Sequence, residues 1–163
     1  MTVDPLDVVK SQLRKYEVRF FLEPERWLAC AHGFKLIWHF VRFENASAAS
    51  IPNDKHGVYF FAIRPDIPQH PLSHYVMYVG KADDMNFRAR FKGYLTEKAD
   101  PDGRPRMKDL LTLWEKHLWF CYAEVPNKSD IEPTEDVLIE AYVPPVNRRF
   151  KGLLSTAISA FMS

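Results

Sequence analysis

The sequence predicts a mixed α/β (α+β) fold, with a small three-stranded antiparallel sheet flanked by helices and a mainly helical N-terminal extension. Its 163 residues, 47% of them hydrophobic and 26% charged, fit one globular domain with an added segment and exclude a disordered or fibrous chain. Short aromatic and β-branched runs alternate with longer segments whose apolar residues recur at helical spacing. The polar stretch 45–55 separates the extension from the main unit.

The N-terminal extension comprises residues 1–50. Asp4 precedes Pro5, which is the pattern of an N-cap followed by a first-turn proline. The apolar residues that follow predict a helix of roughly a dozen residues, because they recur at helical spacing: Leu6, Val9, Leu13 and Tyr16.

Residues 23–43 fit two structures. Glu23-Pro24-Glu25 can open a second helix, whereas Phe34, Leu36, Trp38 and Phe40 alternate like a strand, and the period alone does not decide between them. The small polar residues of 45–55 are typical of a loop or linker. We therefore expect the main unit to span residues 55–150, followed by a C-terminal tail at 151–163.

The main unit contains three expected strands and three expected helices. Residues 57–64 and 74–80 read as a hairpin with a long proline-rich loop, and residues 118–125 as a third strand. Asp83-Asp84 can cap a helix whose apolar stripe is Phe87, Phe91, Tyr94 and Leu95. A second helix carries Met107, Leu110, Leu111 and Trp114, and a third begins near Pro133 and ends at Pro144-Pro145.

Composition restricts the partners and the compartment. The formal net charge of +1 means that any basic surface for nucleic acid must be local. Cys30 and Cys121 lack the spacing of a zinc site, so a reducing compartment is expected. The N-terminus lacks a secretory pattern, and the apolar stretch 27–43 is interrupted by four basic side chains. We expect a cytoplasmic protein that has no membrane partner.

Glu135 is anomalous on the last predicted helix. It falls within the apolar stripe of Leu138, Ile139 and Tyr142, whereas Asp136 and Glu140 lie off that stripe like ordinary solvated charges. Two explanations remain open. The carboxylate complements the helix dipole in the first turn, or it is partly buried and holds a cation such as a metal ion.

Two tyrosine clusters lie on predicted strands, Gly57-Val58-Tyr59 and Tyr78-Val79-Gly80. Alone, each tyrosine would be an ordinary packing residue and each glycine a strand end. In order, however, the motifs resemble the GIY-YIG endonuclease superfamily. The run from Tyr78 through Lys81 to Phe91 is similar to the "YVGKA…NLRKRL" run of excision-repair incision nucleases, and Glu135 to Asn147 to their "E…LI…P..N" tail. The resemblance covers roughly residues 55–150.

The resemblance implies a function for each matching residue. Tyr59 would orient or deprotonate the attacking water, with Tyr78 and Lys81 as its partners, and Arg90 would stabilise the phosphate. Glu135 would bind a single Mg²⁺ or Mn²⁺, and Asn147 would hold the site together. The supporting residues would be Gly57, Gly80, Lys81 and Tyr94.

The sequence departs from the family pattern in two places. The spacer between the tripeptides is long, which suggests a protruding loop at residues 64–74. Two extra residues lie between Lys81 and Asn86, so direct counting would select Arg88 instead of Arg90 as the catalytic arginine. The other candidates for contacts to nucleic acid are Arg88, Lys92, Arg148, Arg149 and Lys151, although the last three also fit a solvated end.

The expected function is therefore a metal-dependent endonuclease that hydrolyses phosphodiester bonds in DNA, with RNA not excluded. The alternative is a catalytically silent, nuclease-like domain that binds nucleic acid or a protein partner. A third possibility is that the N-terminal extension is a docking module for a protein partner or for a second copy of the chain.

Overall fold

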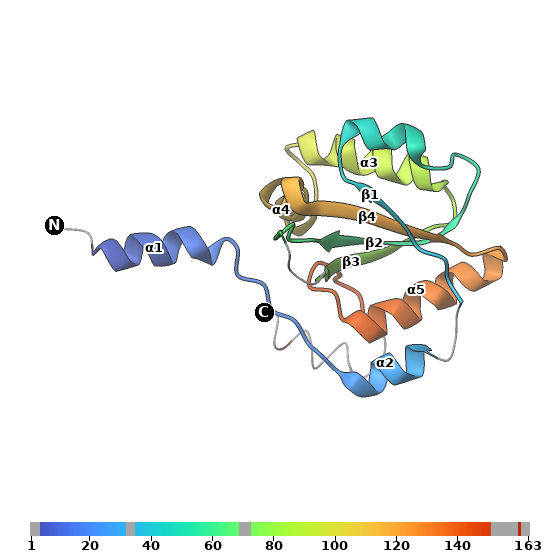
Figure 1. Ribbon diagram of the computed structural model, residues 1–163, viewed down its shortest axis with the longest axis horizontal. Helices are drawn as coiled ribbons and strands as arrows, with labels where there is room; N and C mark the ends of the chain where they lie inside the picture. Colours follow the sequence, from blue (N-terminus) through green and yellow to red (C-terminus); the bar gives the residue numbers. More distant parts are fainter. Residues whose placement is uncertain (1–3, 32–34, 69–72, 151–159, 161–163) are drawn as a thin grey trace.

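Four antiparallel strands form one sheet in the described part of the chain, in the order β1-β4-β2-β3. They are β1 His39–Arg42, β2 Gly57–Ile63, β3 Tyr75–Ala82 and β4 Leu118–Glu124. Helices α3 Phe87–Ala99 and α4 Pro105–Leu113 lie on one side of the sheet, and α2 Pro24–Ala31 and α5 Lys128–Tyr142 on the other (Figure 1). The structure, a computed structural model, describes residues 4–31, 35–68, 73–150 and 160.

Helix α1, Pro5–Arg14, confirms the first predicted helix. The Asp4 carboxylate accepts a hydrogen bond of 2.8 Å from the Leu6 N–H, and Pro5 occupies the first turn. The helix projects away from the sheet, and none of its side chains is buried (Figure 1). Its apolar stripe is therefore exposed.

Residues 23–43 contain the expected helix but little of the expected strand. Helix α2 occupies the first part. Of the alternating residues only Phe40 lies in β1, opposite Cys121 of β4, while Leu36 and Trp38 precede the strand. The expected sheet of three strands is thus wrong by one strand. Strand β1 is a short, largely exposed edge strand, so its sequence carries little alternation between buried and exposed positions. Phe34 lies outside the described residues.

The polar stretch after β1 packs against the core. Residues Asn45–Ser50 form a 3-10 turn, η1, and Ala48 and Ile51 are buried beside Phe43. The expected loop or linker is therefore wrong for residues 45–50, whose small side chains allow η1 to pack on α3, whereas residues 51–55 form no helix or strand. Strand β1 belongs to the same sheet as the strands that follow, and Phe43, Ala48 and Ile51 belong to the same core. Of the predicted tail 151–163, only residue 160 is described.

The predicted hairpin is confirmed by β2 and β3, with Tyr59 opposite Gly80. Strand β2 is central and its side chains are buried on both faces. Tyr59 and Phe61 point into the core under α3 and α4, whereas Val58 and Phe60 point into the core that α5 covers. This explains why the strand is apolar at almost every position.

The two helices on the α3 side carry the predicted apolar residues. Phe87, Phe91 and Tyr94 of α3 are buried, as are Met107, Leu110 and Leu111 of α4. The cap of α3, however, is Asn86, whose side-chain oxygen accepts a hydrogen bond of 2.9 Å from the Ala89 N–H. The expected cap at Asp83-Asp84 is wrong, and Asp83 is left to pair with side chains.

Helix α5 begins at Lys128, five residues before Pro133, where the sequence placed its start. The helix ends at Tyr142, and its C-cap residue Val143 has a φ of 43°, which is left-handed and strained for a β-branched residue. The chain then returns to the edge of β3, where the Val146 N–H donates to the Met77 carbonyl at 3.0 Å. Because the helix begins early, Glu135 lies beyond its first turn.

Within the described ranges, no helix combines the length and the apolar character needed to cross a membrane.

Candidate active site

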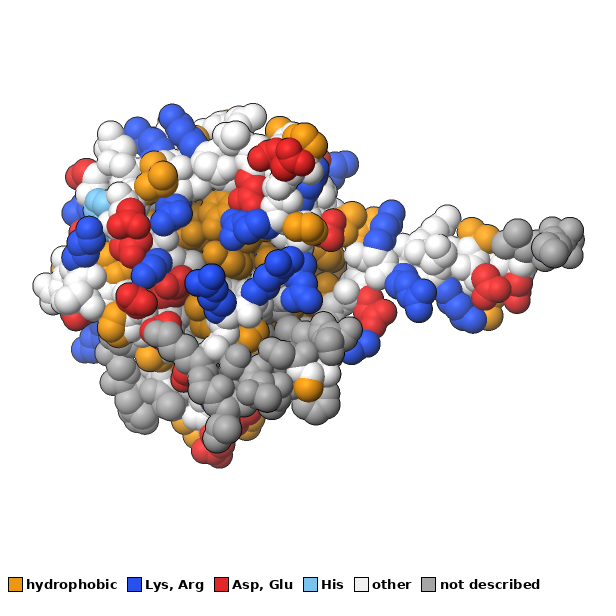
Figure 2. All heavy atoms as spheres, turned by 180° about the vertical axis from the view of Figure 1, so that it is seen from behind, with side chains coloured by type: hydrophobic (Ala, Val, Ile, Leu, Met, Phe, Trp, Pro, Cys, Tyr) orange, Lys and Arg blue, Asp and Glu red, His pale blue; other side chains and the backbone are white. Residues whose placement is uncertain are grey.

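A cavity of about 580 Å³ lies at the edge of β3, between α5, the start of α4 and the segment after α5. On the face opposite to that of Figure 1, Lys and Arg side chains gather beside a hydrophobic hollow (Figure 2). The basic side chains that line the cavity are Lys81, Arg104, Arg106, Arg148 and Arg149. The acidic ones are Glu132, Glu135, Asp136 and Glu140, all on α5.

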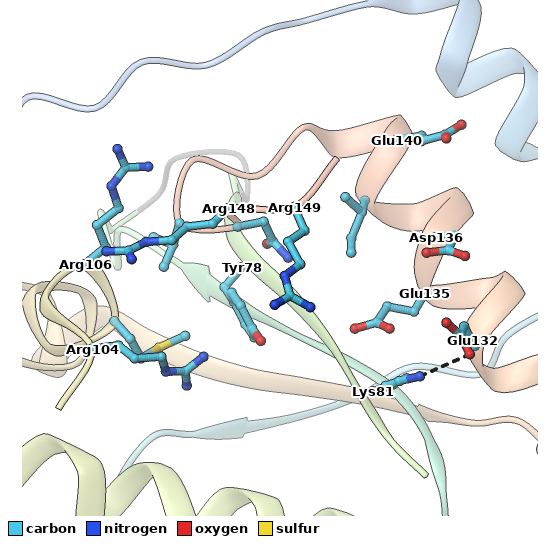
Figure 3. A pocket seen from close by; sticks show the side chains of 14 residues that line it. Tyr78, Lys81, Arg104, Arg106, Glu132, Glu135, Asp136, Glu140, Arg148 and Arg149 are labelled. Carbon is cyan, nitrogen blue, oxygen red and sulfur yellow. Dashed lines mark ion pairs between the residues drawn. The ribbon is translucent and has the colours of Figure 1, made fainter. Parts of the chain in front are cut away.

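Glu135 projects from α5 into this cavity, toward Arg149 and Tyr78 (Figure 3). Its carboxylate makes no hydrogen bond or ion pair with any of the described residues. Burial raises the pKa of Glu135 to about 7; Lys81 opposes the rise, while Asp136, Asp83 and Glu132 add to it. The helix-dipole explanation of this residue is wrong, because Glu135 is not in the first turn of α5.

Lys81 and Arg90 converge on Asp83. The Lys81 Nζ lies 3.1 Å from one Asp83 oxygen and 3.4 Å from a Glu132 oxygen, and the Arg90 Nη2 lies 3.8 Å from the other Asp83 oxygen. Burial alone would raise the pKa of Asp83, but the hydrogen bond and charge of Lys81 keep it below its ordinary value. Burial works to lower the pKa of Lys81, yet Asp83, Glu132 and Glu135 raise it on balance. Lys81 therefore remains charged.

Three tyrosines meet on the α3 side of the hairpin. The hydroxyls of Tyr59 and Tyr94 share a hydrogen bond of 2.8 Å, and the Tyr78 ring centroid lies 6.4 Å from that of Tyr59 and 6.2 Å from that of Tyr94. Burial raises the pKa of Tyr59 and of Tyr94 above the ordinary tyrosine value. Tyr78 adds to the rise of both pKa values, and the hydrogen bond with Tyr59 partly opposes the rise at Tyr94. Only Tyr78 of the three lines the cavity.

The glycines of the two tripeptides are required by close contacts. Gly57 has a φ of 152°, and a side-chain carbon there would lie 2.3 Å from the Ala123 carbonyl oxygen on β4. A side-chain carbon at Gly80 would lie 2.6 Å from the Tyr59 hydroxyl oxygen. Gly57 thus permits the approach of β4, and Gly80 leaves space for the Tyr59 ring.

Asn147 is buried and joins the returning chain to the edge of β3. Its side-chain oxygen accepts a hydrogen bond from the Val79 N–H, and its side-chain nitrogen donates to the Val79 carbonyl, both at 2.9 Å. The amide therefore satisfies both backbone groups of an edge-strand residue. It also fixes the segment that carries Arg148 and Arg149 next to Tyr78.

The structure gives the two candidate arginines of α3 different surroundings. Arg88 donates to the Ile51 carbonyl at 2.7 Å and the Ala49 carbonyl at 3.1 Å, so its guanidinium fastens η1 to the helix. Arg90 faces Asp83 and is close enough to Tyr59 for its charge to act on that hydroxyl. Its buried Nε has no hydrogen-bond partner in the described part of the chain.

The fold brings part of the predicted set together. Tyr78, Lys81, Glu135 and Asn147 line one cavity with Arg148 and Arg149. Tyr59, Tyr94 and Arg90 lie behind it, next to Tyr78 or Lys81. Arg88 and Lys92 are not among the lining residues, and Lys151 lies outside the described residues.

Sequence reasoning missed several cavity residues. Arg104 pairs with both carboxylate oxygens of Glu97, at 2.8 and 2.9 Å, and its guanidinium lies 5.8 Å from the Tyr94 ring centroid. The Glu97 hydrogen bonds raise the pKa of Arg104. Nothing in the sequence marks Arg104 or Arg106, because both come from the loop and first turn that lead into α4. Glu132, three residues before Glu135, could have been found from helical spacing.

The cavity offers one inward-facing carboxylate, Glu135, as a ligand for a divalent metal ion. The described residues contain no group of three or more His, Cys, Asp or Glu side chains placed to hold a metal. Mg²⁺ nevertheless keeps several of its waters and commonly takes only one or two carboxylates plus substrate phosphates. Glu135 provides one such carboxylate, partly buried among other acidic groups.

A comparison with protein-family models, curated proteins and solved structures found no match to this chain.

Proposed function

We propose that the chain is a metal-dependent endonuclease of the GIY-YIG type, which hydrolyses phosphodiester bonds in DNA in a cytoplasmic setting. The observation that best supports the proposal is the composition of the β3-edge cavity. There, the Glu135 carboxylate and the Tyr78 hydroxyl share one space with Lys81, Arg148 and Arg149. These groups match the requirements of hydrolysis: a cation ligand, a water-orienting group and donors for the phosphate.

The phosphate would bind between the two basic walls of the cavity. Arg148 and Arg149 extend over it from the segment after α5, and Arg104 and Arg106 come from the start of α4 (Figure 3). Guanidinium groups hold phosphate oxygens in a bidentate manner and keep their charge at every physiological pH. Arg104 is already paired with Glu97, so Arg106, Arg148 and Arg149 would provide most of the attraction.

Glu135 would hold the metal ion, with water and phosphate oxygens as the remaining ligands. When bound, the ion would polarise the phosphoryl oxygen and stabilise the negative charge of the leaving group. Lys81 lies close enough to Glu135 to favour its ionised form, while Glu132 and Asp83 keep the Lys81 ammonium in place. The carboxylate is thereby positioned without being neutralised by a direct ion pair.

The tyrosines would have separate functions. A group that orients or deprotonates water must reach the cavity, and Tyr78 does so. Tyr59 is buried, its pKa is raised, and its hydroxyl is engaged by Tyr94. We therefore assign the water-orienting function to Tyr78, and to Tyr59 the function of holding Tyr94 and the hairpin in position. Arg90, which shares Asp83 with Lys81, would stabilise the developing phosphate charge.

The test is a cleavage assay with purified protein. Linear, nicked, branched and single-stranded DNA substrates are incubated with Mg²⁺, Mn²⁺ or EDTA, and the same series is run with RNA. We expect cleavage with either metal and none in EDTA. Glu135→Gln should abolish cleavage, whereas Glu25→Gln, which removes an exposed carboxylate on α2, should leave it unchanged.

The alternative function is binding of nucleic acid without chemistry, which the burial of Tyr59 favours. It predicts that the protein binds the same substrates, with equal affinity in Mg²⁺ and EDTA, and cuts none of them. Cleavage that survives Glu135→Gln would contradict the metal function of Glu135 and with it the proposed mechanism.

A further inference from the structure

A second groove, of about 380 Å³, adjoins the cavity. It lies between the segment that follows α1, helix α4 and the segment after α5, and it shares Arg106 and Val146 with the cavity. The groove therefore continues the cavity toward the N-terminal extension. The groove residues that come from the N-terminal extension lie outside the GIY-YIG-like motifs.

The border of the groove is basic. Arg14, Lys15 and Arg19 line it from the extension and Arg106 from α4, against the two acidic residues Glu17 and Asp109. The Arg19 Nε lies 3.8 Å from a Glu17 oxygen, so one of the two acidic side chains is paired with a basic side chain of the same groove. Together with Arg148 and Arg149, these side chains extend the basic surface from the cavity to the end of α1.

The apolar side chains that line the groove include the half-buried indole of Trp114. Trp114 lines it with Leu113, Met77 and Val146, and the Tyr16 ring meets the Trp114 ring edge to face at 6.2 Å. An aromatic ring beside several cationic side chains is an arrangement that binds unpaired nucleotides, because bases stack on the ring and phosphates contact the cations. The bases of a duplex are already stacked within the helix and are not free to stack on a protein ring.

We propose that this groove binds a single strand of nucleic acid that runs out of the β3-edge cavity, with its phosphates on Arg106, Arg14 and Lys15 and a base on Trp114. The choice of occupant rests on the proposed function of the adjoining cavity and on the complementary charge. An acidic protein segment would satisfy the cations but would make no use of the indole that lines the groove. The N-terminal extension is thus part of the substrate-binding surface.

The test is equilibrium binding in EDTA, where metal-dependent cleavage cannot interfere. A fluorescein-labelled 20-nucleotide single strand, the same strand as RNA and the corresponding DNA duplex are titrated with protein at several salt concentrations. The variant Arg14→Gln/Lys15→Gln removes two charges from the groove. The matched control, Lys10→Gln/Lys116→Gln, removes two exposed charges that do not line it.

We expect the groove variant to bind single strands about tenfold more weakly, and its log–log salt slope to be smaller in magnitude by about 1.4, since each phosphate contact contributes about 0.7. The control should match wild type, and the duplex should bind both proteins equally. Trp114→Leu should remove the quenching of indole fluorescence that the single strand causes. Whichever of the DNA and RNA single strands depends more strongly on the groove identifies its polynucleotide.

Three outcomes would overturn the proposal: an unchanged salt slope in Arg14→Gln/Lys15→Gln, an equal loss in the control, or displacement of the single strand by an acidic peptide but not by unlabelled DNA. These outcomes are separate from failure of the proposed endonuclease. A protein that cuts nothing but loses single-strand affinity in the groove variant would retain the groove and lose only the chemistry. A protein that cuts DNA with the groove variant unchanged would show the reverse.

Discussion

The Tyr59 ring on β2 lies against the α-carbon of Gly80 on β3, directly opposite in the strand register. A side-chain carbon at Gly80 would be 2.6 Å from the Tyr59 hydroxyl oxygen and 2.7 Å from the ring carbon that bears it. The Tyr59 ring cannot move away, because it is buried and its hydroxyl is bonded to Tyr94. The second tripeptide therefore carries a glycine because the tyrosine of the first one requires the space.

Gly80→Ala should lower the free energy of unfolding by about 1–3 kcal/mol, the usual cost of overpacking a core. Gly93→Ala is the matched control, since Gly93 lies inside α3 with nothing within 4 Å of an added side chain. The control should stabilise the protein by about 0.5–1 kcal/mol through helix propensity. Urea unfolding of both variants measures the difference. Equal free energies of unfolding for Gly80→Ala and Gly93→Ala would contradict the close contact between Gly80 and the Tyr59 ring.

Asn147→Ala should cost about 2–3 kcal/mol of stability, because it leaves the Val79 N–H and carbonyl without their buried partners. Asn127→Ala removes only an exposed bond to Asp130 and should change stability by less than about 0.5 kcal/mol. Thermal unfolding compares the two. Should Asn147→Ala unfold at the wild-type temperature, the returning chain would not depend on this amide.

Arg88→Ala and Arg90→Ala should fail in different ways. Arg88 supplies two hydrogen bonds to backbone carbonyls, so its replacement should cost about 1–3 kcal/mol of stability. Arg90 has a buried nitrogen without a partner among the described residues, and its replacement should lower cleavage by roughly a hundredfold with little effect on folding. Denaturation and single-turnover cleavage, measured on both variants, separate the effects. The reverse result would favour Arg88 as the catalytic arginine.

The stability of the protein in EDTA should fall as the pH rises from 5 to 8. Burial raises the pKa of Glu135 from the ordinary 4.5 to about 7, so between these values the folded state binds a proton that the unfolded chain has released. The stability that the protonated Glu135 side chain contributes is fully present below pH 4.5 and is lost as the pH rises through about 7. Glu135→Gln should be less sensitive to pH over this range. At pH 8, Mg²⁺ should raise the unfolding temperature of the wild type but not of the variant.

Much of the secondary structure could be predicted from the sequence. The capped first helix, the β2–β3 hairpin, strand β4 and the buried stripes of α3 and α4 follow from periodicity and turn residues. Strand β1 and the start of α5 could not be predicted. An edge strand of four residues has little buried surface, and the hydrogen bonds that define it come from a strand far along the chain. Pro133 looked like a helix start because proline is tolerated in the first turn, but it lies inside the helix.

The sequence by itself determined which residues are unusual: a carboxylate within an apolar stripe, two tyrosine–glycine tripeptides and an asparagine after a double proline. Those features are local and depend on spacing along one element. Only the tertiary structure decided that Tyr78 lines the cavity while Tyr59 does not, and that Arg88 binds backbone carbonyls while Arg90 faces Asp83. It also placed Arg104 and Arg106 opposite Glu135. The physical reason is that burial and charge pairing depend on residues that meet only when distant segments pack, and no periodicity along the chain records those meetings.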